Sequence, residues 1–232
     1  MKPIYKKISE KSHAHDENWQ WAIAVTTTDR REHSTLQRTL ESFRDTGFEP
    51  PVVFADLGKK CDIWNWHRAM SFLVSTYPDA NAYAIVEDDV VFAKDIRFYL
   101  EKTLWPNVKS DGCICSIFTP TCYAKEERWH ILNRGRDTWM SQFRIYHPKA
   151  AHRMIHEIHE FADFSSPERQ NDGVIGEWAS RHDVDIWFHN PSLVQHLGMG
   201  LTTYETKMPE RVELGMANDF IGEDVSALDL LH

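Results

Sequence analysis

The stretch "AYAIVEDDVVF", residues 82–92, sets three consecutive acids, Glu87, Asp88 and Asp89, between two apolar runs. Each run is short and rich in β-branched residues, which is typical of a buried strand. Three adjacent carboxylates repel one another, and desolvating each costs several kcal/mol unless positive charge compensates it. We therefore expect the chain to carry this charge to the edge of its core, where a cation can reach it.

Strands and helices alternate through the first hundred residues. Strands are expected at 21–28, within 50–58 and at 82–86; helices are expected around 36–43, at 64–77 and after Asp95, which is predicted to cap its helix. This alternation predicts an α/β fold with a mostly parallel central sheet flanked by helices. Ligands of such sheets bind at the carboxyl ends of the strands. Thr26–Thr28, Asp56 and Glu87–Asp89 all fall at those ends.

The second half of the chain is less regular. Strands are expected in 113–118, 142–147 and 185–190, helices from Pro148 and from Asn171, and loop-like chain beyond Thr203. We predict a single domain over 19–204. An arm at 1–18 and a tail or lid at 205–232 would flank it.

Composition narrows the class of protein. The 232 residues carry a net charge of −9, which argues against general binding to nucleic acid or anionic membranes. No apolar run reaches the roughly 18 residues of a membrane span, and residues 1–21 lack the apolar stretch of a secretory signal, so a cytoplasmic protein is expected. The four cysteines form no CxxC pair, which makes a zinc site improbable.

The glycine content indicates how a nucleotide would be held. The chain has only 10 glycines and neither GxGxxG nor GxxxxGK[ST], the loops that usually cradle phosphate. A divalent ion such as Mn²⁺ or Mg²⁺ can instead join carboxylates to a diphosphate. His196 is a further candidate ligand, because neutral imidazole suits Mn²⁺. A solvated turn or helix cap at the acids, and a structural histidine in a loop, are the alternatives.

Three motifs in this order carry a family resemblance: "AYAIVEDDVVF", "NDGVIGEW" (171–178) and "PSLVQHLG" (191–198). Together they resemble the metal-dependent glycosyltransferases of the GT-A fold, nearest the inverting N-acetylglucosaminyltransferase-like branch. The similarity spans about Trp21 to Gly198, and it implies a nucleotide-sugar half over about 19–110 and an acceptor half over about 111–204. After Gly198 the chain reads "MGLTT" where that branch has a serine-rich continuation.

The resemblance implies a role for particular positions. Asp89 would bind the metal, His196 would approach the metal or the diphosphate, and Asp172 would be the catalytic base, with Glu177 in reserve. The remaining positions implied for the nucleotide-sugar donor, expected to be UDP-linked, are Thr26, Thr28, Arg30, Asp56, Asn65, Trp66, Glu87 and Asp88. A helix N-cap at Asn171 or Asp172 is the competing interpretation of the second motif.

The acceptor is the least determined part. The segment 123–137 gathers Lys125, Arg128, Arg134 and Arg136 around Trp129, which suits a polyanionic acceptor or is an ordinary solvated loop. A glycan and a modified nucleic-acid base are the candidate acceptors. Two further functions stay open: a metal-dependent nucleotidyltransferase or phosphohydrolase, and a non-catalytic binder of nucleotide sugars.

Overall fold

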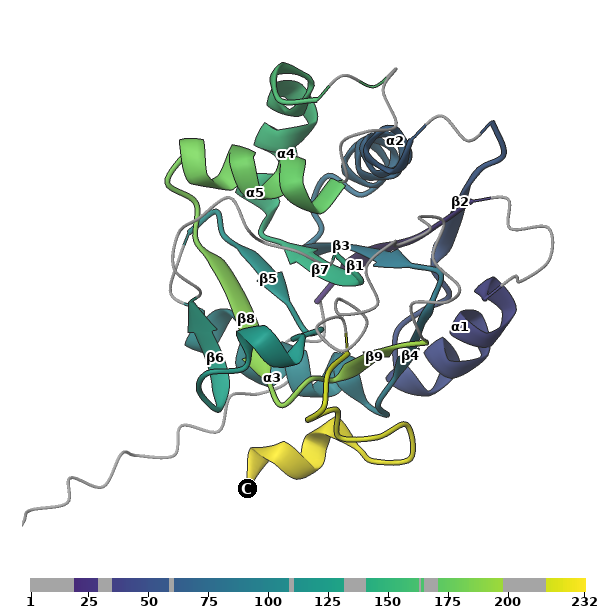
Figure 1. Ribbon diagram of the computed structural model, residues 1–232, viewed down its shortest axis with the longest axis vertical. Helices are drawn as coiled ribbons and strands as arrows, with labels where there is room; N and C mark the ends of the chain where they lie inside the picture. Colours follow the sequence, from purple (N-terminus) through teal and green to yellow (C-terminus); the bar gives the residue numbers. More distant parts are fainter. Residues whose placement is uncertain are drawn as a thin grey trace, which may run out of the picture.

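The computed structural model describes residues 19–28, 35–58, 61–108, 111–131, 141–162, 164, 171–197 and 216–232. In these ranges a seven-stranded sheet runs through the middle of the molecule, with helices on both faces (Figure 1). Its strands are β1 (Trp21–Thr28), β2 (Val52–Asp56), β3 (Ala82–Glu87), β5 (Ile114–Ser116), β6 (Arg128–Ile131), β7 (Phe143–Tyr146) and β8 (Ile186–Asn190). A separate two-stranded ribbon joins β4 (Val90–Phe92) to β9 (Val194–His196).

The helices connect these strands. The α-helices are α1 (Leu36–Phe43), α2 (Asp62–Thr76), α3 (Ile96–Asn107), α4 (Pro148–Glu157) and α5 (Asn171–Arg181). Short 3₁₀ turns are η1 (Arg44–Thr46), η2 (Thr121–Tyr123), η3 (Ile158–Glu160) and η7 (Ala227–Leu231). No helix within the described ranges is long and apolar enough to cross a lipid bilayer.

The sheet order is β2-β1-β3-β7-β5-β8-β6. β1 is parallel to β2 and β3, and β5 is parallel to β8, whereas β7 is antiparallel to both β3 and β5 and β6 is antiparallel to β8. The strands β1, β2, β3, β5 and β8 therefore run one way, and β6 and β7 run the other. The predicted single-domain α/β fold with a mostly parallel, helix-flanked sheet is confirmed.

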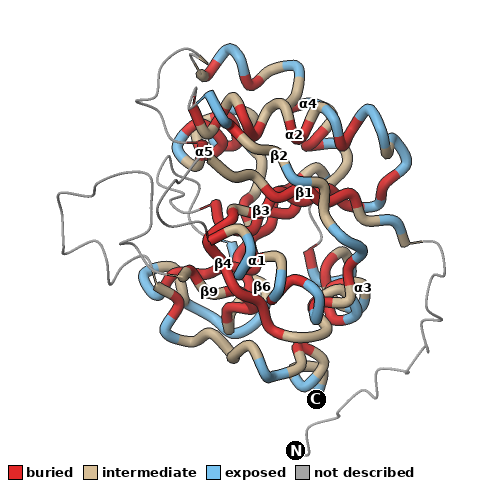
Figure 2. The backbone as a smooth tube through the Cα atoms, turned by 90° about the vertical axis from the view of Figure 1, so that its right-hand side faces the viewer, coloured by how far each residue is buried: buried red, intermediate tan, exposed pale blue. Residues whose placement is uncertain are grey.

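Two hydrophobic layers hold the sheet. The alternation of β3 shows how the layers form, since Tyr83 and Ile85 join the layer under α2, α4 and α5, while Ala84 and Val86 join the layer under α1 and α3. Buried residues concentrate in β1 and β3, and exposed residues lie on the outer turns of the helices (Figure 2). Burial on both faces explains why the central strands are almost continuously apolar.

Two local predictions were wrong. Asp95 occupies the N-cap position of α3, but its φ of 58° is left-handed and its carboxylate accepts a hydrogen bond from Ser226 Oγ at 2.6 Å rather than capping the helix. The segment predicted as a basic loop contains the edge strand β6, and the half-buried Trp129 packs edge-on against His189. Arg134 and Arg136 lie outside the described residues.

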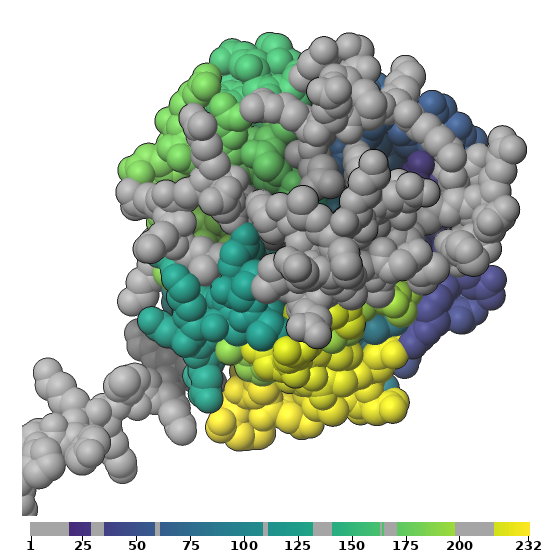
Figure 3. Space-filling model, viewed as in Figure 1, coloured from purple at the N-terminus to yellow at the C-terminus, as the bar shows by residue number. Residues whose placement is uncertain are grey.

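The C-terminal segment 216–232 packs on the α3 side of the molecule. Its backbone bonds to Lys94 through Val225 and Ala227, and Glu223 pairs with Arg38 of α1. In Figure 3 the yellow atoms of this segment lie beside α1. Residues 216–226 are irregular, as predicted, but the chain then ends in the 3₁₀ turn η7 and buries Ala227.

Candidate active site

The acidic triplet lies where β3 ends and β4 begins. Glu87 is the last residue of β3, and both Asp88 and Asp89 are only 3% exposed. The Thr39 hydroxyl oxygen lies 2.7 Å from the Asp88 carbonyl oxygen and 2.9 Å from that of Val90, and it accepts a hydrogen bond from the Val90 amide at 3.1 Å. The triplet is therefore anchored within the fold, which argues against a solvated turn.

The carboxylate of Asp88 is directed toward β1. The Thr27 hydroxyl donates a hydrogen bond to Asp88 Oδ2. Because Thr27 follows Thr26, whose register partner on β3 is Glu87, this bond joins the ends of two neighbouring parallel strands. The bond therefore fixes the orientation of the Asp88 side chain, which is directed toward the end of β1.

The ribbon of β4 and β9 brings His196 to the acids. Val90 pairs with His196 in antiparallel register, so the histidine lies beside the triplet despite a separation of more than a hundred residues. His196 Nε2 lies 3.3 Å from Asp89 Oδ2, with side-chain exposures of 2% and 4%. The Leu197 amide also donates to the Asp89 carbonyl at 2.8 Å. The predicted pairing of Asp89 with His196 in space is thus present in the fold.

Gln195 anchors β9 from its other side. Its amide group donates to the Ala217 carbonyl at 2.8 Å and accepts from the Ala217 amide at 3.1 Å. This two-way bond ties the strand that carries His196 to the packed C-terminal segment. The position of His196 therefore depends on contacts with β4 and with the C-terminal segment.

More carboxylates gather at the same edge of the sheet. The pKa of Glu87 is raised to about 7, chiefly by burial and then by the negative charges of Asp89, Asp172 and Asp62, while a hydrogen bond from Ser141 lowers it. Burial likewise raises the pKa of Asp62 to about 6, with a smaller increase from Asp172. The four acids therefore lie within electrostatic reach of one another.

Two helix N-termini meet these acids. Asp62 begins α2, where its Oδ1 accepts from the Ile63 amide at 2.7 Å, and its Oδ2 accepts from the amide of Asn171, the first residue of α5, at 2.9 Å. The positive ends of helix dipoles favour negative charge nearby. The N-termini of α2 and α5 therefore offset part of the repulsion among the carboxylates. Asp62 also connects the two helices, because it accepts a hydrogen bond from the backbone of each.

Asp172 and Glu177, the two candidate bases, occupy different parts of α5. Asp172 is in the first turn, is partly exposed, and its Oδ1 accepts from the Gly173 amide at 2.6 Å. Glu177 lies roughly 7 Å further along the helix and pairs with Arg181 at 3.6 Å. The charge of Asp172 is among the causes that raise the pKa of Glu87. Asp172 is therefore the candidate base for which the structure gives a link to the strand-end acids.

The residues predicted for the donor nucleoside lie at the ends of β1 and β2. Asn65 Nδ2 donates to the carbonyls of Thr27 at 3.2 Å and Phe54 at 2.9 Å, which ties the two strands together. Thr28 Oγ1 lies 3.4 Å from the Asp56 carbonyl. Asp56 and Asn65 are 5% and 3% exposed, and one side-chain oxygen of each, Oδ1, is buried without a hydrogen-bond partner in the described part of the chain.

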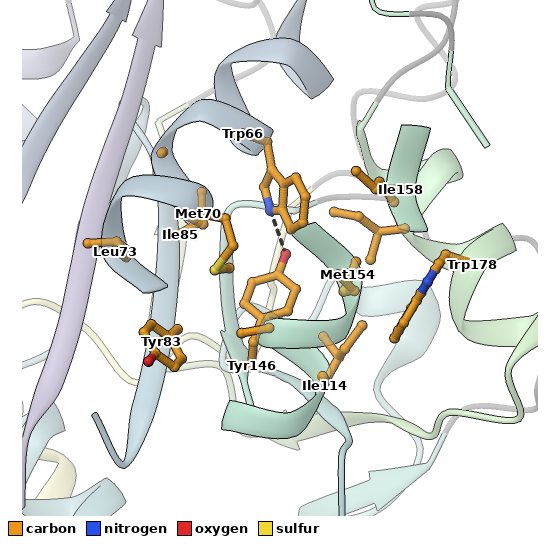
Figure 4. Packing of buried hydrophobic residues seen from close by; sticks show 14 of the residues in the cluster. Trp66, Met70, Leu73, Tyr83, Ile85, Ile114, Tyr146, Met154, Ile158 and Trp178 are labelled. Atoms are coloured by element: carbon orange, nitrogen blue, oxygen red, sulfur yellow. Dashed lines mark hydrogen bonds between the residues drawn. The ribbon is translucent and has the colours of Figure 1, made fainter. Parts of the chain in front are cut away.

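Of the other residues predicted to bind the nucleotide-sugar donor, Thr26 lies beside the acids and Trp66 lies in the core. Thr26 Oγ1 bonds to the Val86 carbonyl at 3.3 Å and so lies beside the triplet. Trp66 is 1% exposed, and its indole N–H donates to the Tyr146 hydroxyl at 2.9 Å inside the apolar layer (Figure 4). Trp66 is therefore a core residue, not a wall of a nucleoside pocket. Arg30 lies outside the described residues.

Sequence reasoning missed Asp62, three residues that contact the acids (Ser141, Gln142 and Asn171 as a bridging residue), and a buried charge in β7, Arg144. Arg144 interrupts the apolar strand β7 and is fully buried. The pKa of Tyr146 is raised to about 12, chiefly by burial; the charge of Arg144 lowers this pKa and that of Glu87 raises it, so both charges act on one buried hydroxyl. An arginine within an apolar strand pattern was the available signal.

The arrangement is incomplete as a metal centre. Among the described residues, no group of three or more His, Cys, Asp or Glu side chains could hold a metal ion. Asp89 and His196 are the pair whose chemistry suits Mn²⁺, a carboxylate with an imidazole. Any ion held there would need additional oxygen ligands.

Comparisons with known proteins give limited information. No family model and no curated protein matches the chain. The structure "A197 from STIV" is similar with a TM-score of 0.44 and 12% identity, over 75% of this chain and 83% of that one. A glucose-1-phosphate thymidylyltransferase structure from Bacillus anthracis, in complex with a sucrose, gives a TM-score of 0.41 and 12% identity, over 74% and 69%. At these values the likeness supports no inference about activity.

Proposed function

We propose that this protein is a metal-dependent glycosyltransferase that moves a sugar from a UDP-linked donor to an acceptor hydroxyl. The observation that carries the proposal is the buried Asp89–His196 pair, 3.3 Å apart, within an acidic cluster at the carboxyl ends of parallel strands. That edge is where α/β sheets bind ligands.

The protein residues fit a metal that is shared with the donor. Mn²⁺ and Mg²⁺ are commonly held by one or two protein groups together with phosphate oxygens and water. Asp89 and His196 would supply the protein ligands, and the diphosphate would complete the site. When bound, the ion supplies Lewis-acid stabilisation of the charge that grows on the leaving diphosphate, worth several kcal/mol.

The strand ends beside the acids suit the nucleoside. The buried Oδ1 atoms of Asp56 and Asn65 are acceptors, and a nucleobase N–H or a ribose hydroxyl can donate to them. A buried acceptor without a partner costs about 1–3 kcal/mol, so such a donor would be bound favourably. Thr26 and Thr28 lie at the same edge, and Asp88 is directed toward it by Thr27.

Asp172 is the proposed general base. It lies in the first turn of α5, partly exposed, within electrostatic reach of Glu87. A carboxylate that removes the acceptor hydroxyl proton contributes roughly 10²–10⁴-fold to the rate. Attack by that hydroxyl opposite the leaving diphosphate would invert the anomeric centre, and the freed proton would remain on Asp172.

The acceptor is proposed only as a class. Lys125 and Arg128 of the predicted basic segment are exposed, and Arg128 is the first residue of the edge strand β6. They suit a glycan that carries negative charge, or a modified base within a nucleic acid. Testing both acceptor types with the same donor would separate them.

Turnover of the donor tests the proposal. The protein is mixed with Mn²⁺ and UDP-glucose, UDP-galactose or UDP-N-acetylglucosamine, and released nucleotide is identified by chromatography. Release of UDP from at least one donor, abolished by EDTA, is expected even without an acceptor, because water can replace it slowly. Release of UMP would instead indicate a phosphohydrolase, and binding without turnover a non-catalytic binder; either result contradicts the proposal.

A further inference from the structure

A chain of hydrogen bonds joins four separate segments beneath the acidic cluster. Asp62 accepts from the Asn171 amide, the Asn171 side-chain oxygen lies 2.5 Å from Ser141 Oγ, and Ser141 Oγ bonds to Glu87 Oε1. These contacts connect the start of α2, the start of α5, the residue preceding the turn into β7, and the end of β3. The two residues of each hydrogen bond are far apart in sequence: 109 residues for Asp62 and Asn171, 30 for Asn171 and Ser141, and 54 for Ser141 and Glu87.

Ser141 is the central link. It is 6% exposed and Asn171 is 5% exposed, so water cannot readily replace either bond. A serine hydroxyl has one proton and can donate to only one of its two neighbours. Both contacts are satisfied when Ser141 donates to Glu87 and accepts from the amide NH₂ of Asn171, because the two ends of an amide group are interchangeable by a half turn.

Glu87 is held from the adjacent residue as well. The Glu87 amide donates to the Gln142 carbonyl at 2.9 Å, and Gln142 Nε2 lies 3.5 Å from Glu87 Oε2. The segment 141–142 therefore contacts both the backbone and the carboxylate of Glu87. Of these contacts, only the Ser141 hydroxyl also reaches α5.

We propose that Ser141 is a positioning residue: its hydroxyl couples Glu87 to the first residue of α5 and thereby fixes where Asp172 lies relative to the strand-end acids. The inference rests on the proposed function for the role of Asp172. Asp172 directly follows Asn171, so any shift of the bridged residue moves the base. A misplacement of 1 Å at a reacting group can cost about 10²-fold in rate.

The test compares Ser141→Ala and Ser141→Thr with Ser42→Ala. Ser42 is the control for the loss of a buried serine hydroxyl, since it bonds to the Glu223 carboxylate at 3.1 Å and accepts from the Phe92 amide of β4 at 2.9 Å, and neither bond involves Glu87 or α5. Each full-length variant is assayed for amide hydrogen exchange over 171–181, for kcat and KM with the UDP-sugar and Mn²⁺, and for UDP–Mn²⁺ affinity by calorimetry.

Ser141→Ala is expected to speed exchange over 171–181 about tenfold and to lower kcat 10- to 100-fold, with UDP–Mn²⁺ affinity within twofold of the wild type. Ser141→Thr, which keeps the hydroxyl, should have the amide exchange and the kcat of the wild type. Ser42→Ala should change neither the exchange over 171–181 nor kcat. Unchanged amide exchange in Ser141→Ala, or a kcat loss in Ser141→Ala equal to that in Ser42→Ala, would overturn the inference about Ser141. Either result would leave the proposed function standing. Absence of turnover in the wild-type protein would instead remove the proposed function, and with it the role of Ser141 in positioning the base.

Discussion

Replacing Glu87 by glutamine should stabilise the metal-free protein, and the gain should depend on pH. The folded state raises the pKa of this carboxyl from 4.5 to about 7, chiefly through burial and then through the charges of Asp89, Asp172 and Asp62. Folding therefore favours the protonated acid. The cost of the charged form is absent below pH 4.5 and grows until the pH passes about 7.

The size of the effect follows from the two pKa values. A difference of about 2.5 at about 1.36 kcal/mol for each pH unit gives a full cost of roughly 3 kcal/mol above pH 7. Of this, about 2.5 kcal/mol develops between pH 5 and pH 8. Glutamine has no charge to desolvate, and its carbonyl still accepts from Ser141 as Glu87 Oε1 does.

Urea unfolding in EDTA at pH 5 and pH 8 measures the prediction. Glu87→Gln should be about 2–3 kcal/mol more stable than the wild type at pH 8 and within about 1 kcal/mol at pH 5. Glu41→Gln serves as the control, since Glu41 is exposed and Gln37 is the one partner of its carboxylate among the hydrogen bonds described. An equal change at both pH values, or destabilisation at pH 8, would refute the reasoning about burial and charge repulsion.

Two further substitutions separate catalysis from packing. Asp172→Asn should retain UDP–Mn²⁺ affinity and lower kcat by roughly 10²–10⁴-fold, because the amide cannot take the acceptor proton; near-normal turnover in a steady-state assay would assign the base elsewhere. Tyr146→Phe should lower the free energy of unfolding by about 1–3 kcal/mol, because it leaves the buried Trp66 N–H without its acceptor. The affinity of Tyr146→Phe for UDP, measured by calorimetry, should equal that of the wild type. A large loss of affinity would indicate that Trp66 and Tyr146 belong to the nucleotide site after all.

Local patterns were sufficient for most of the fold. β1 has the predicted bounds, and α4 and α5 begin at the predicted Pro148 and Asn171. The period of α2 also placed Trp66 on the inward face, which the structure confirms, whereas the family resemblance alone had assigned it to a nucleoside pocket. For this residue helical periodicity was the better guide, since it reports burial directly.

Long-range pairing accounts for what the sequence did not reveal. The ribbon β4–β9 depends on the register between Val90 and His196. The hydrogen bonds among Ser141, Asn171 and Asp62 depend on tertiary packing. Neither feature produces a periodic pattern in the sequence. Asp95 illustrates the converse: an acid before a helix has the composition of a cap, but Ser226 from the far end of the chain takes its carboxylate. Glu87, Asp89 and Asp172 were therefore identified from the sequence, whereas Asp62 and the bonds that join these acids were not.

Calorimetric titration of UDP in the presence of Mn²⁺, with wild-type protein and Asp89→Asn, tests the central claim most directly. Asp89 lies 3.3 Å from His196, and the proposed metal joins this pair to the donor diphosphate. Wild-type protein should bind UDP only when Mn²⁺ is present, and Asp89→Asn should lose that binding while its circular dichroism spectrum stays native. Equal UDP affinity in the two proteins, or in the wild type with and without Mn²⁺, would contradict the account.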